Sequence, residues 1–192
     1  MLTGGRSSRM GRDKALLEFD GATLVERIAA RVRDAAGNVT LIGVPGIGVP
    51  GLGVPGIGVS EKYAALGLPV LADLIEHAGP LGGILTALAS SQADWNLIVA
   101  CDMPAVTAEF LNGLLEAAVA GDHACLAPET RDGIHPLCAV YHRRALPAVR
   151  DAIDHKCFKM QDFLKSIRAA SWPIADAAML QNVNTPAEWT AR

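Results

Sequence analysis

The sequence predicts an α/β fold in which a mostly parallel sheet is covered by helices on both faces. Short apolar runs alternate along the chain with stretches of helical periodicity, and this alternation is typical of repeated βα units. The run WNLIVAC at residues 95–101 is mostly apolar, which indicates a central strand buried on both faces. Glycine-rich and acidic motifs follow several predicted strands, where such sheets bind their ligands.

The first predicted helix spans residues 23–36. Thr23 and Glu26 have the spacing of a capping box, in which each side chain bonds the backbone N–H of the other residue. Gly37 ends the helix, and residues 39–42 form a short apolar strand. The residues that share the inner face of this helix are Leu24, Ile28, Val32 and Ala35.

The rest of the chain continues the alternation. Further strands are expected over residues 68–71, 95–101, 124–127 and 136–141. Further helices are expected over residues 83–90, 107–120, 144–154 and 160–169.

Size and composition exclude several classes of protein. With 192 residues, 51% hydrophobic and 19% charged, the chain has the size of one domain, which we expect to span residues 1–192. Apolar stretches end well short of the roughly 18 residues that a membrane span needs, which excludes an integral membrane protein. Residues 1–14 lack the apolar core of a secretory signal. The net charge of −3 gives no general attraction to nucleic acid.

The cysteines indicate a reducing compartment. They are spread without a C-x-x-C pair, which argues against a zinc site or a disulfide scaffold. They are Cys101, Cys125, Cys138 and Cys157. We therefore expect a cytoplasmic protein. We also expect a monomer with neither nucleic-acid nor membrane partners.

Residues 44–58 differ from everything around them. They read VPGIG-VPGLG-VPGIG, consecutive copies of a pentapeptide that resembles the repeats of elastin. Pro followed by Gly favours a type II turn, and the pattern has neither helix nor strand period. We interpret the segment as a surface loop inserted into a host domain, with a natural long loop as the alternative.

A basic, glycine-rich motif occupies residues 2–17, LTGGRSSRMGRDKALL. Gly4 and Gly5 allow a turn whose N–H groups can approach a phosphate. Nearby cations can neutralise that phosphate, and they are Arg6, Arg9, Arg12 and Lys14. The motif is neither a Walker A loop nor G-x-G-x-x-G. It predicts a phosphate site, with a solvated basic loop as the alternative.

Together with later segments, this motif resembles the molybdenum cofactor guanylyltransferases. The further segments are VLAD at 70–73, GPLGGI at 79–84, ACDMP at 100–104, HPLCAVY at 135–141 and NVNTP at 182–186. The resemblance implies a three-layer, Rossmann-like nucleotidyltransferase fold with a mostly parallel central sheet. The Gly-Gly pair and the pair Asp13-Lys14 favour the guanylyl branch over cytidylyl relatives.

The resemblance also implies roles for individual residues. Leu2, Thr3 and Gly4 would hold GTP through their backbone. Lys14 would bind the phosphates and stabilise charge on the α-phosphoryl group, as a catalytic residue. Asp73 would contact the nucleotide, although Asp at this position also suits a turn or a helix cap.

Asp102 would be the metal-binding and second catalytic residue, and would also contact the nucleotide. It follows a buried strand, and Mg²⁺ prefers carboxylate oxygens combined with substrate phosphates. A helix N-cap is the alternative for Asp102. Residues implied to bind the pterin substrate or the phosphates are Arg9, Gly79, Gly83, Asn182 and Asn184.

Two features depart from the family pattern. Only Met1 and Leu2 stand before Thr3, where relatives have an apolar strand of several residues, so we expect much of that strand's buried contact to be lost. Relatives also carry a short loop after the strand at 39–42, with a polar residue, often Asn, that contacts the nucleotide. Gly43 and then the repeat stand there instead.

The sequence therefore predicts a Mg²⁺-dependent enzyme that transfers GMP from GTP to the phosphate of the molybdopterin cofactor and releases pyrophosphate. Other proteins of molybdenum cofactor biosynthesis are candidate partners. One alternative is a cytidylyl- or sugar-nucleotidyltransferase of the same fold. Another is a non-catalytic engineered scaffold that displays the elastin-like peptide.

Overall fold

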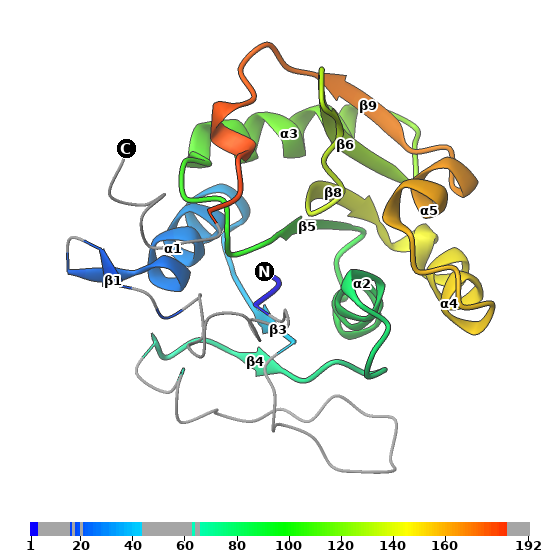
Figure 1. The fold of residues 1–192 in the computed structure, drawn as a ribbon, viewed down its shortest axis with the longest axis horizontal. Coiled ribbons are helices and arrows are strands. Elements are labelled where there is room, and N and C mark those ends of the chain that lie inside the picture. Colours follow the sequence, from blue (N-terminus) through cyan, green and yellow to red (C-terminus); the bar gives the residue numbers. More distant parts are fainter. Residues whose placement is uncertain (4–15, 17, 20, 44–62, 64–65, 184–192) are drawn as a thin grey trace.

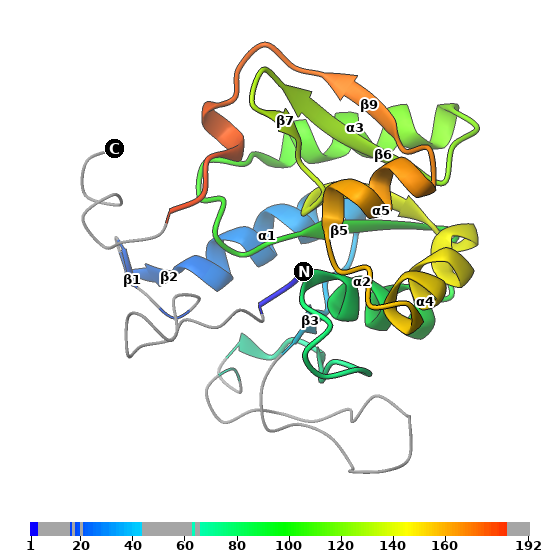
Figure 2. The ribbon, with the colours of Figure 1, turned by 45° about the vertical axis from the view of Figure 1, so that its right-hand side comes forward.

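A central sheet separates two layers of helices in the computed structural model of the chain (Figures 1 and 2). The structure describes residues 1–3, 16, 18–19, 21–43, 63 and 66–183. The helices are α1 Leu24–Ala36, α2 Pro80–Ser90, α3 Ala108–Ala120, α4 Leu146–Asp154 and α5 Met160–Ser166. Two 3-10 helices, η3 and η4, span Arg143–Ala145 and Ala178–Leu180.

Most strands belong to the central sheet, whereas β1 (Glu18–Phe19) and β2 (Ala22–Thr23) form a separate antiparallel hairpin before α1. The other strands are β3 Leu41–Ile42, β4 Val70–Leu71, β5 Trp95–Val99, β6 Cys125–Thr130, β7 Gly133–Ile134, β8 Cys138–His142 and β9 Ala170–Pro173. Leu2 joins the pair β3–β4 to the larger sheet through parallel bridges to Ile42 and Ala100. The order across the sheet is therefore β4, β3, Leu2, β5, β8, β6 and β9, with β7 paired to the end of β6.

The predicted mostly parallel sheet is correct only in part. β3 with β4, β6 with β9 and both bridges of Leu2 are parallel. β8 runs antiparallel to both of its neighbours, β5 and β6, and β7 is antiparallel to β6. The physical reason is the connection: β6 returns through the short β7 hairpin, which is too short for the helical crossover that a parallel neighbour needs.

Alternate residues of the strands enter the two different layers. In β3, β5 and β8, one residue packs with α1 and α3 and the next packs with α2, α4 and α5. Ile98 and Val99 show this for β5, because they belong to opposite clusters and are 2% and 0% exposed. The predicted burial of β5 on both faces is confirmed for these residues.

Helix α1 has the predicted boundaries and cap. The Thr23 N–H donates to Glu26 Oε2 (2.6 Å), and the Glu26 N–H donates to Thr23 Oγ1 (3.3 Å). The Thr23 hydroxyl also donates to Glu26 Oε2 (2.7 Å), and this bond, together with the one from the Thr23 N–H, holds the pKa of Glu26 below its usual value. Gly37 ends the helix with a φ of 75°, a left-handed conformation that glycine adopts without strain.

Several other boundaries differ from the prediction. β3 and β4 are shorter than expected and begin at Leu41 and Val70. α2 begins at Pro80, before the expected position 83, because proline suits the first turn of a helix. β7 and β9 were not expected. The repeat at 44–58 lies outside the described residues, and within those that are described no helix is long and apolar enough to cross a membrane.

Candidate functional site

Four strand ends meet along one edge of the sheet. Because Leu2, β3, β4 and β5 are parallel, the residues that follow them emerge on the same side. We call this the carboxyl edge, and its residues are Thr3, Gly43, Asp73 and Asp102. Three of them were predicted as site residues from the sequence, and the topology brings them to one edge.

Backbone hydrogen bonds fix Leu2 and Thr3 at the centre of this edge. The Leu2 N–H donates to the Val99 carbonyl (2.8 Å), and the Leu2 carbonyl accepts from the Cys101 N–H (3.1 Å). Thr3 donates to the Ile42 carbonyl from both its N–H (2.9 Å) and its hydroxyl (3.0 Å). The segment that begins at Gly4 therefore starts from a fixed point.

Asp73 is a half-buried residue whose surroundings disfavour the charged form of its carboxylate. Its Oδ1 is buried and has no hydrogen-bond partner among the residues that the structure describes. Burial raises the pKa of Asp73, since the charged form loses hydration. Such a group costs stability unless a cation or a donor approaches it, which makes Asp73 a candidate for ligand contact.

The first turn of α2 lies beside Asp73. Gly79, at the N-cap, has a φ of 58° and is exposed, and no side chain caps the helix. Pro80 has no N–H, and the N–H of Gly82 donates to the Gly79 carbonyl (3.1 Å). The N–H groups of Leu81 and Gly83 are the ones that suit an anion, because the helix dipole places partial positive charge there. A β-carbon on Gly83 would lie 2.8 Å from Leu2 Cδ2 and 3.7 Å from Asp73 Oδ1, so the absence of a side chain lets the helix approach both.

Thr86 ties the loop after Asp73 to α2, and sequence reasoning missed this residue. Its hydroxyl accepts from the Leu74 N–H (2.9 Å) and donates to the Gly82 carbonyl (2.8 Å), and it is fully buried. A buried threonine in an apolar helix could have signalled such a link, because buried hydroxyls need partners.

Asp102 is held from two sides. Its carbonyl accepts from the Val183 N–H (2.8 Å), which brings the exposed Asn182 to the carboxyl edge. On the other side Arg31 of α1 donates to the carbonyls of Val106 (2.7 Å) and Pro104, and so fixes the loop after Asp102. Asp102 and Asn182 are thus brought together as the predicted site requires.

His135 stands beside this region and was not among the predicted site residues. The Ala100 N–H donates to the Leu137 carbonyl (2.7 Å), which places the turn around His135 next to the segment that leads to Asp102. His135 Nε2 lies 3.1 Å from the hydroxyl of Thr130, a buried residue. Burial lowers the pKa of His135.

The carboxylate of Asp102 is chemically suited to a Mg²⁺ ion that is shared with a phosphate ligand. No group of three or more His, Cys, Asp or Glu side chains that could hold a metal occurs in the described part of the chain. Mg²⁺ does not need one, because it binds through one or two carboxylates together with substrate phosphates and waters. Asp102, which follows β5, can supply such a carboxylate.

Four predicted site residues lie outside the described residues. They are Gly4, Arg9, Lys14 and Asn184.

Known proteins are similar to this chain over nearly all of its length. A family model described as "MobA-like NTP transferase domain" matches residues 1–171. The "Probable molybdenum cofactor guanylyltransferase" of Pelotomaculum thermopropionicum is 33% identical over 196 residues, which cover 98% of this chain and 87% of that protein. A protein of the same name from Carboxydothermus hydrogenoformans is 32% identical over 196 residues and covers 98% and 91%.

Solved structures have the same fold. Molybdopterin-guanine dinucleotide biosynthesis protein A from Archaeoglobus fulgidus has a TM-score of 0.75 at 22% identity, covering 99% of this chain and 93% of that one. The 2-C-methyl-D-erythritol 4-phosphate cytidylyltransferase of Thermus thermophilus has a TM-score of 0.67 at 16% identity, with coverage of 99% and 94%. The predicted nucleotidyltransferase-like α/β fold is therefore confirmed, whereas the predicted mostly parallel sheet is confirmed only in part.

Proposed function

The chain belongs to the family of MobA-like NTP transferase domains, and we propose that it transfers GMP from GTP to the phosphate of the molybdopterin cofactor, releasing pyrophosphate. One observation carries this proposal. This chain is 33% identical to a protein named as a probable molybdenum cofactor guanylyltransferase. It also brings Thr3, Asp73 and Asp102 to one edge of its sheet, beside the first turn of α2.

The nucleotide would lie across the centre of the carboxyl edge. The backbone of Leu2, Thr3 and Gly4 would contact GTP, because that segment is anchored between β3 and β5. Lys14 would bind the phosphates and stabilise charge that develops on the α-phosphoryl group. Asp73 would accept a hydrogen bond from the nucleotide through its unsatisfied oxygen, which relieves the cost of its burial.

Asp102 would hold a Mg²⁺ ion together with the phosphates of GTP. When bound, the ion would supply charge stabilisation and orientation for the triphosphate. The backbone bonds that fix Asp102 and the following loop keep the carboxylate in place at the end of β5. A residue that is fixed in advance pays little reorganisation when the ligand binds.

The pterin phosphate would bind next to the first turn of α2. Contacts are proposed for Arg9, Gly79, Gly83, Asn182 and Asn184. From there an oxygen of the pterin phosphate attacks the α-phosphorus of GTP in line, a new P–O bond forms, and the bond to pyrophosphate breaks. The reaction needs positioning and charge stabilisation from the protein, and no covalent intermediate.

We infer that residues 1–192 form one nucleotidyltransferase domain and that the elastin-like repeat at 44–58 is an insertion in it. The enzyme would act in the cytoplasm as a monomer, with other proteins of molybdenum cofactor biosynthesis as its partners.

The test is pyrophosphate release from GTP in the presence of Mg²⁺ and molybdopterin cofactor. Asp102→Asn keeps the size of the side chain but removes the charge that Mg²⁺ needs, so we expect near-complete loss of turnover with an unchanged circular dichroism spectrum. Activity above about a tenth of the wild-type value, roughly 1.4 kcal/mol in barrier, would contradict the metal role. Faster release from CTP than from GTP would favour the cytidylyl alternative.

A further inference from the structure

The segment that returns from β6 into β8 contains a bulge at the carboxyl edge. The register pairs Glu129 with Ile134 of β7 and Leu126 with Val140 of β8. Between these two pairs β6 has two residues and the returning segment has five, three more than a regular ladder needs. Extra residues in one strand form a β-bulge, which turns a side chain in a new direction. His135 is the first residue between β7 and β8.

Pro128 of β6 explains why the bulge lies here. The His135 N–H donates to the Pro128 carbonyl (2.9 Å), so Pro128 faces the returning segment. The N–H and the carbonyl of one strand residue point to the same side, and proline has no N–H with which to complete the ladder. Proline within a sheet is therefore tolerated at bulges. The sequence of β6 thus determines where His135 leaves the regular ladder.

The bulge is held firmly, because each carbonyl from Ile134 to Leu137 accepts a hydrogen bond. The donors, in chain order of the carbonyls, are Gln161 Nε2 (3.1 Å), the Cys138 N–H (3.3 Å), the buried Tyr141 hydroxyl (2.9 Å) and the Ala100 N–H (2.7 Å). The last of these bonds joins the bulge to the segment that leads from β5 to Asp102. The fold therefore sets the position of His135 before any ligand binds.

Thr130 fixes which ring nitrogen of His135 carries a proton. The Thr130 hydroxyl is buried, accepts from the Asp132 N–H (3.1 Å) and lies 3.1 Å from His135 Nε2. Its other acceptor, the Gly133 carbonyl, is farther away at 3.4 Å, so the hydroxyl donates to Nε2. Burial lowers the pKa of His135, against the opposing effect of Asp132, so the ring is neutral at neutral pH. A neutral ring that accepts at Nε2 carries its proton on Nδ1.

This Nδ1–H is a donor at the carboxyl edge. Nδ1 makes no hydrogen bond to any residue that the structure describes, and the side chain is half-buried. In the order of the strands, His135 lies beyond Asp102, on the side away from Asp73 and the proposed nucleotide. A ligand that contacts both Asp102 and His135 therefore extends away from the nucleotide. The second substrate is the ligand that approaches from this side, since the nucleotide takes the other.

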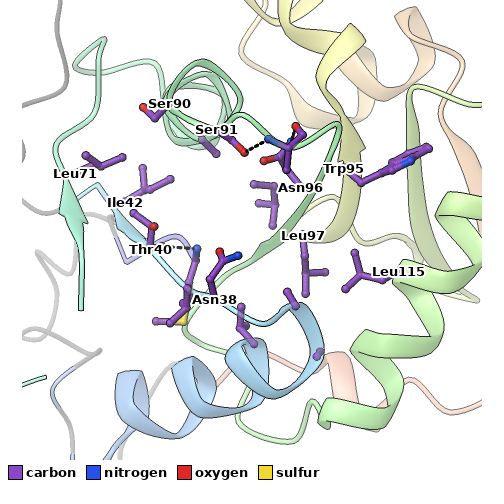
Figure 3. Close-up of a pocket in the computed structure, with 18 residues that line it drawn as sticks. Asn38, Thr40, Ile42, Leu71, Ser90, Ser91, Trp95, Asn96, Leu97 and Leu115 are labelled. Atoms are coloured by element: carbon purple, nitrogen blue, oxygen red, sulfur yellow. Dashed lines mark hydrogen bonds between the residues drawn. The ribbon is translucent and has the colours of Figure 1, made fainter. Parts of the chain in front are cut away.

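A cavity of about 510 Å³ at the opposite end of the sheet does not suit that substrate (Figure 3). Thr40, which precedes β3, lines one side of it, and Trp95 and Leu97 of β5 line the other. None of the described residues that line the cavity carries a charged side chain. A substrate that bears a phosphate finds no charged partner there, whereas the carboxyl edge combines Asp102 with the donor of His135.

We propose that His135 binds the molecule that accepts GMP, by donating a hydrogen bond from Nδ1 to an unprotonated oxygen of that molecule. The inference rests on the proposed guanylyl transfer and adds a substrate contact to it. Both a phosphate oxygen and a carbonyl of the pterin ring have the required chemistry, because both accept from a neutral donor. Thr130 is then a positioning residue, which acts on the substrate only through the ring of His135.

The kinetic test measures KM for GTP and KM for the molybdopterin cofactor separately, from pyrophosphate release with Mg²⁺. His135→Leu removes the donor at similar size, so KM for the cofactor should rise at least about tenfold while KM for GTP stays within about twofold. His135→Asn is the matched variant, because its amide can place an N–H near the position of Nδ1, and both KM values should stay within about threefold of wild type. His155→Leu, at an exposed histidine, is the control and should change neither value.

The spectroscopic test does not depend on activity. In protein that carries ¹⁵N-labelled histidine, we expect the neutral ring of His135 to hold its proton on Nδ1, and Thr130→Val should lose this preference. The spectrum of His135→Asn identifies the resonances. Inorganic phosphate and an unphosphorylated pterin are the two probes. A shift of Nδ1 with phosphate assigns the contact to the phosphate of the substrate, and a shift with the pterin assigns it to the ring.

Three results would overturn the proposal. They are a proton on Nε2 in the wild-type protein, a KM for the cofactor that His135→Leu leaves unchanged, and an equal rise in KM for GTP, which would place the contact on the nucleotide. If the wild-type protein released no pyrophosphate, the proposed function would fail instead. The response of Nδ1 to the two probes would then decide on His135 by itself, since no shift with either probe means that it binds neither group.

Discussion

At the scale of single residues, Asp73 carries a charge where charge destabilises the fold. Asp73→Asn keeps the shape and removes the charge, so we expect the free energy of unfolding at neutral pH to rise by about 1 kcal/mol, while GTP affinity falls. Urea unfolding and nucleotide titration measure the two effects. Opposite signs for stability and binding are typical of a functional carboxylate.

The pH dependence of this effect has a definite sign. The pKa of Asp73 is raised in the folded state, so the folded protein binds the proton more tightly than the unfolded chain does. The penalty is therefore complete above the folded pKa and disappears as the pH falls below 3.8, the ordinary value. Glu76→Gln is the control, since that side chain is 87% exposed in the same loop and should change nothing. An Asn variant less stable than wild type at neutral pH would mean that the carboxylate has a stabilising partner.

Alanine substitutions of Lys14 and Arg12 distinguish a specific phosphate contact from a diffuse positive patch. Lys14→Ala should lower GTP affinity by about tenfold or more, the value of a charge-assisted hydrogen bond, whereas Arg12→Ala should have a smaller effect. Titrations at low and high salt provide the measurement. Equal losses that both vanish at high salt would indicate only a patch.

The sequence predicted which residues gather at the carboxyl edge better than it predicted how they are held there. The family resemblance indicated both Asp73 and Asp102, and the buried strand before Asp102 supported its role independently. The bond from Val183 to Asp102 joins residues far apart in the chain, and nothing local to either one announces it. The same is true of Arg31, whose bonds to the loop after Asp102 depend on how α1 packs.

At the scale of elements, alanine substitutions at two helical glycines should change the stability of the protein in opposite directions. A β-carbon on Gly82 of α2 would lie 2.9 Å from the backbone carbonyl oxygen of Ile75, whereas one on Gly113 of α3 would lie 3.5 Å from Trp172. Gly82→Ala should destabilise the protein by about 1–3 kcal/mol through overpacking. Gly113→Ala should stabilise it by up to about 1 kcal/mol, because alanine favours helix.

Chemical denaturation of both variants tests this pair. If Gly82→Ala were as stabilising as Gly113→Ala, the loop between Asp73 and α2 would have to move freely, and Thr86 could not be holding it.

Helix α1 was predicted to within one residue because its cap, periodicity and terminating glycine are all local. β9 was missed because its sequence, ASWP, has no apolar run and its residues are only partly buried or exposed. It exists because β6 offers a free edge to which Ala170 and the following residues pair in parallel. Such pairing is a property of the assembled sheet, and a short segment does not encode it.

At the scale of the whole molecule, the repeat at 44–58 remains a prediction from the sequence. Deleting it should leave the melting temperature nearly unchanged, since loop-closure entropy depends only weakly on length. GTP affinity should rise if the repeat crowds the nucleotide, because Gly43, from which it departs, is bonded to Leu71 at the carboxyl edge (3.1 Å). Calorimetry and nucleotide titration measure the two effects. A large drop in melting temperature would show that the repeat packs into the fold.

The position of Leu2 also constrains when the protein can fold during its synthesis. Leu2 is translated early but pairs with Ile42 and with Ala100, so the middle of the sheet cannot close until the ribosome has released the chain past position 100. At about 5–20 residues per second this is a delay of about 5 to 20 seconds. During that interval the edge of β3 stays open to other nascent chains, so the rate of translation between these positions should influence how much of the protein is recovered in soluble form.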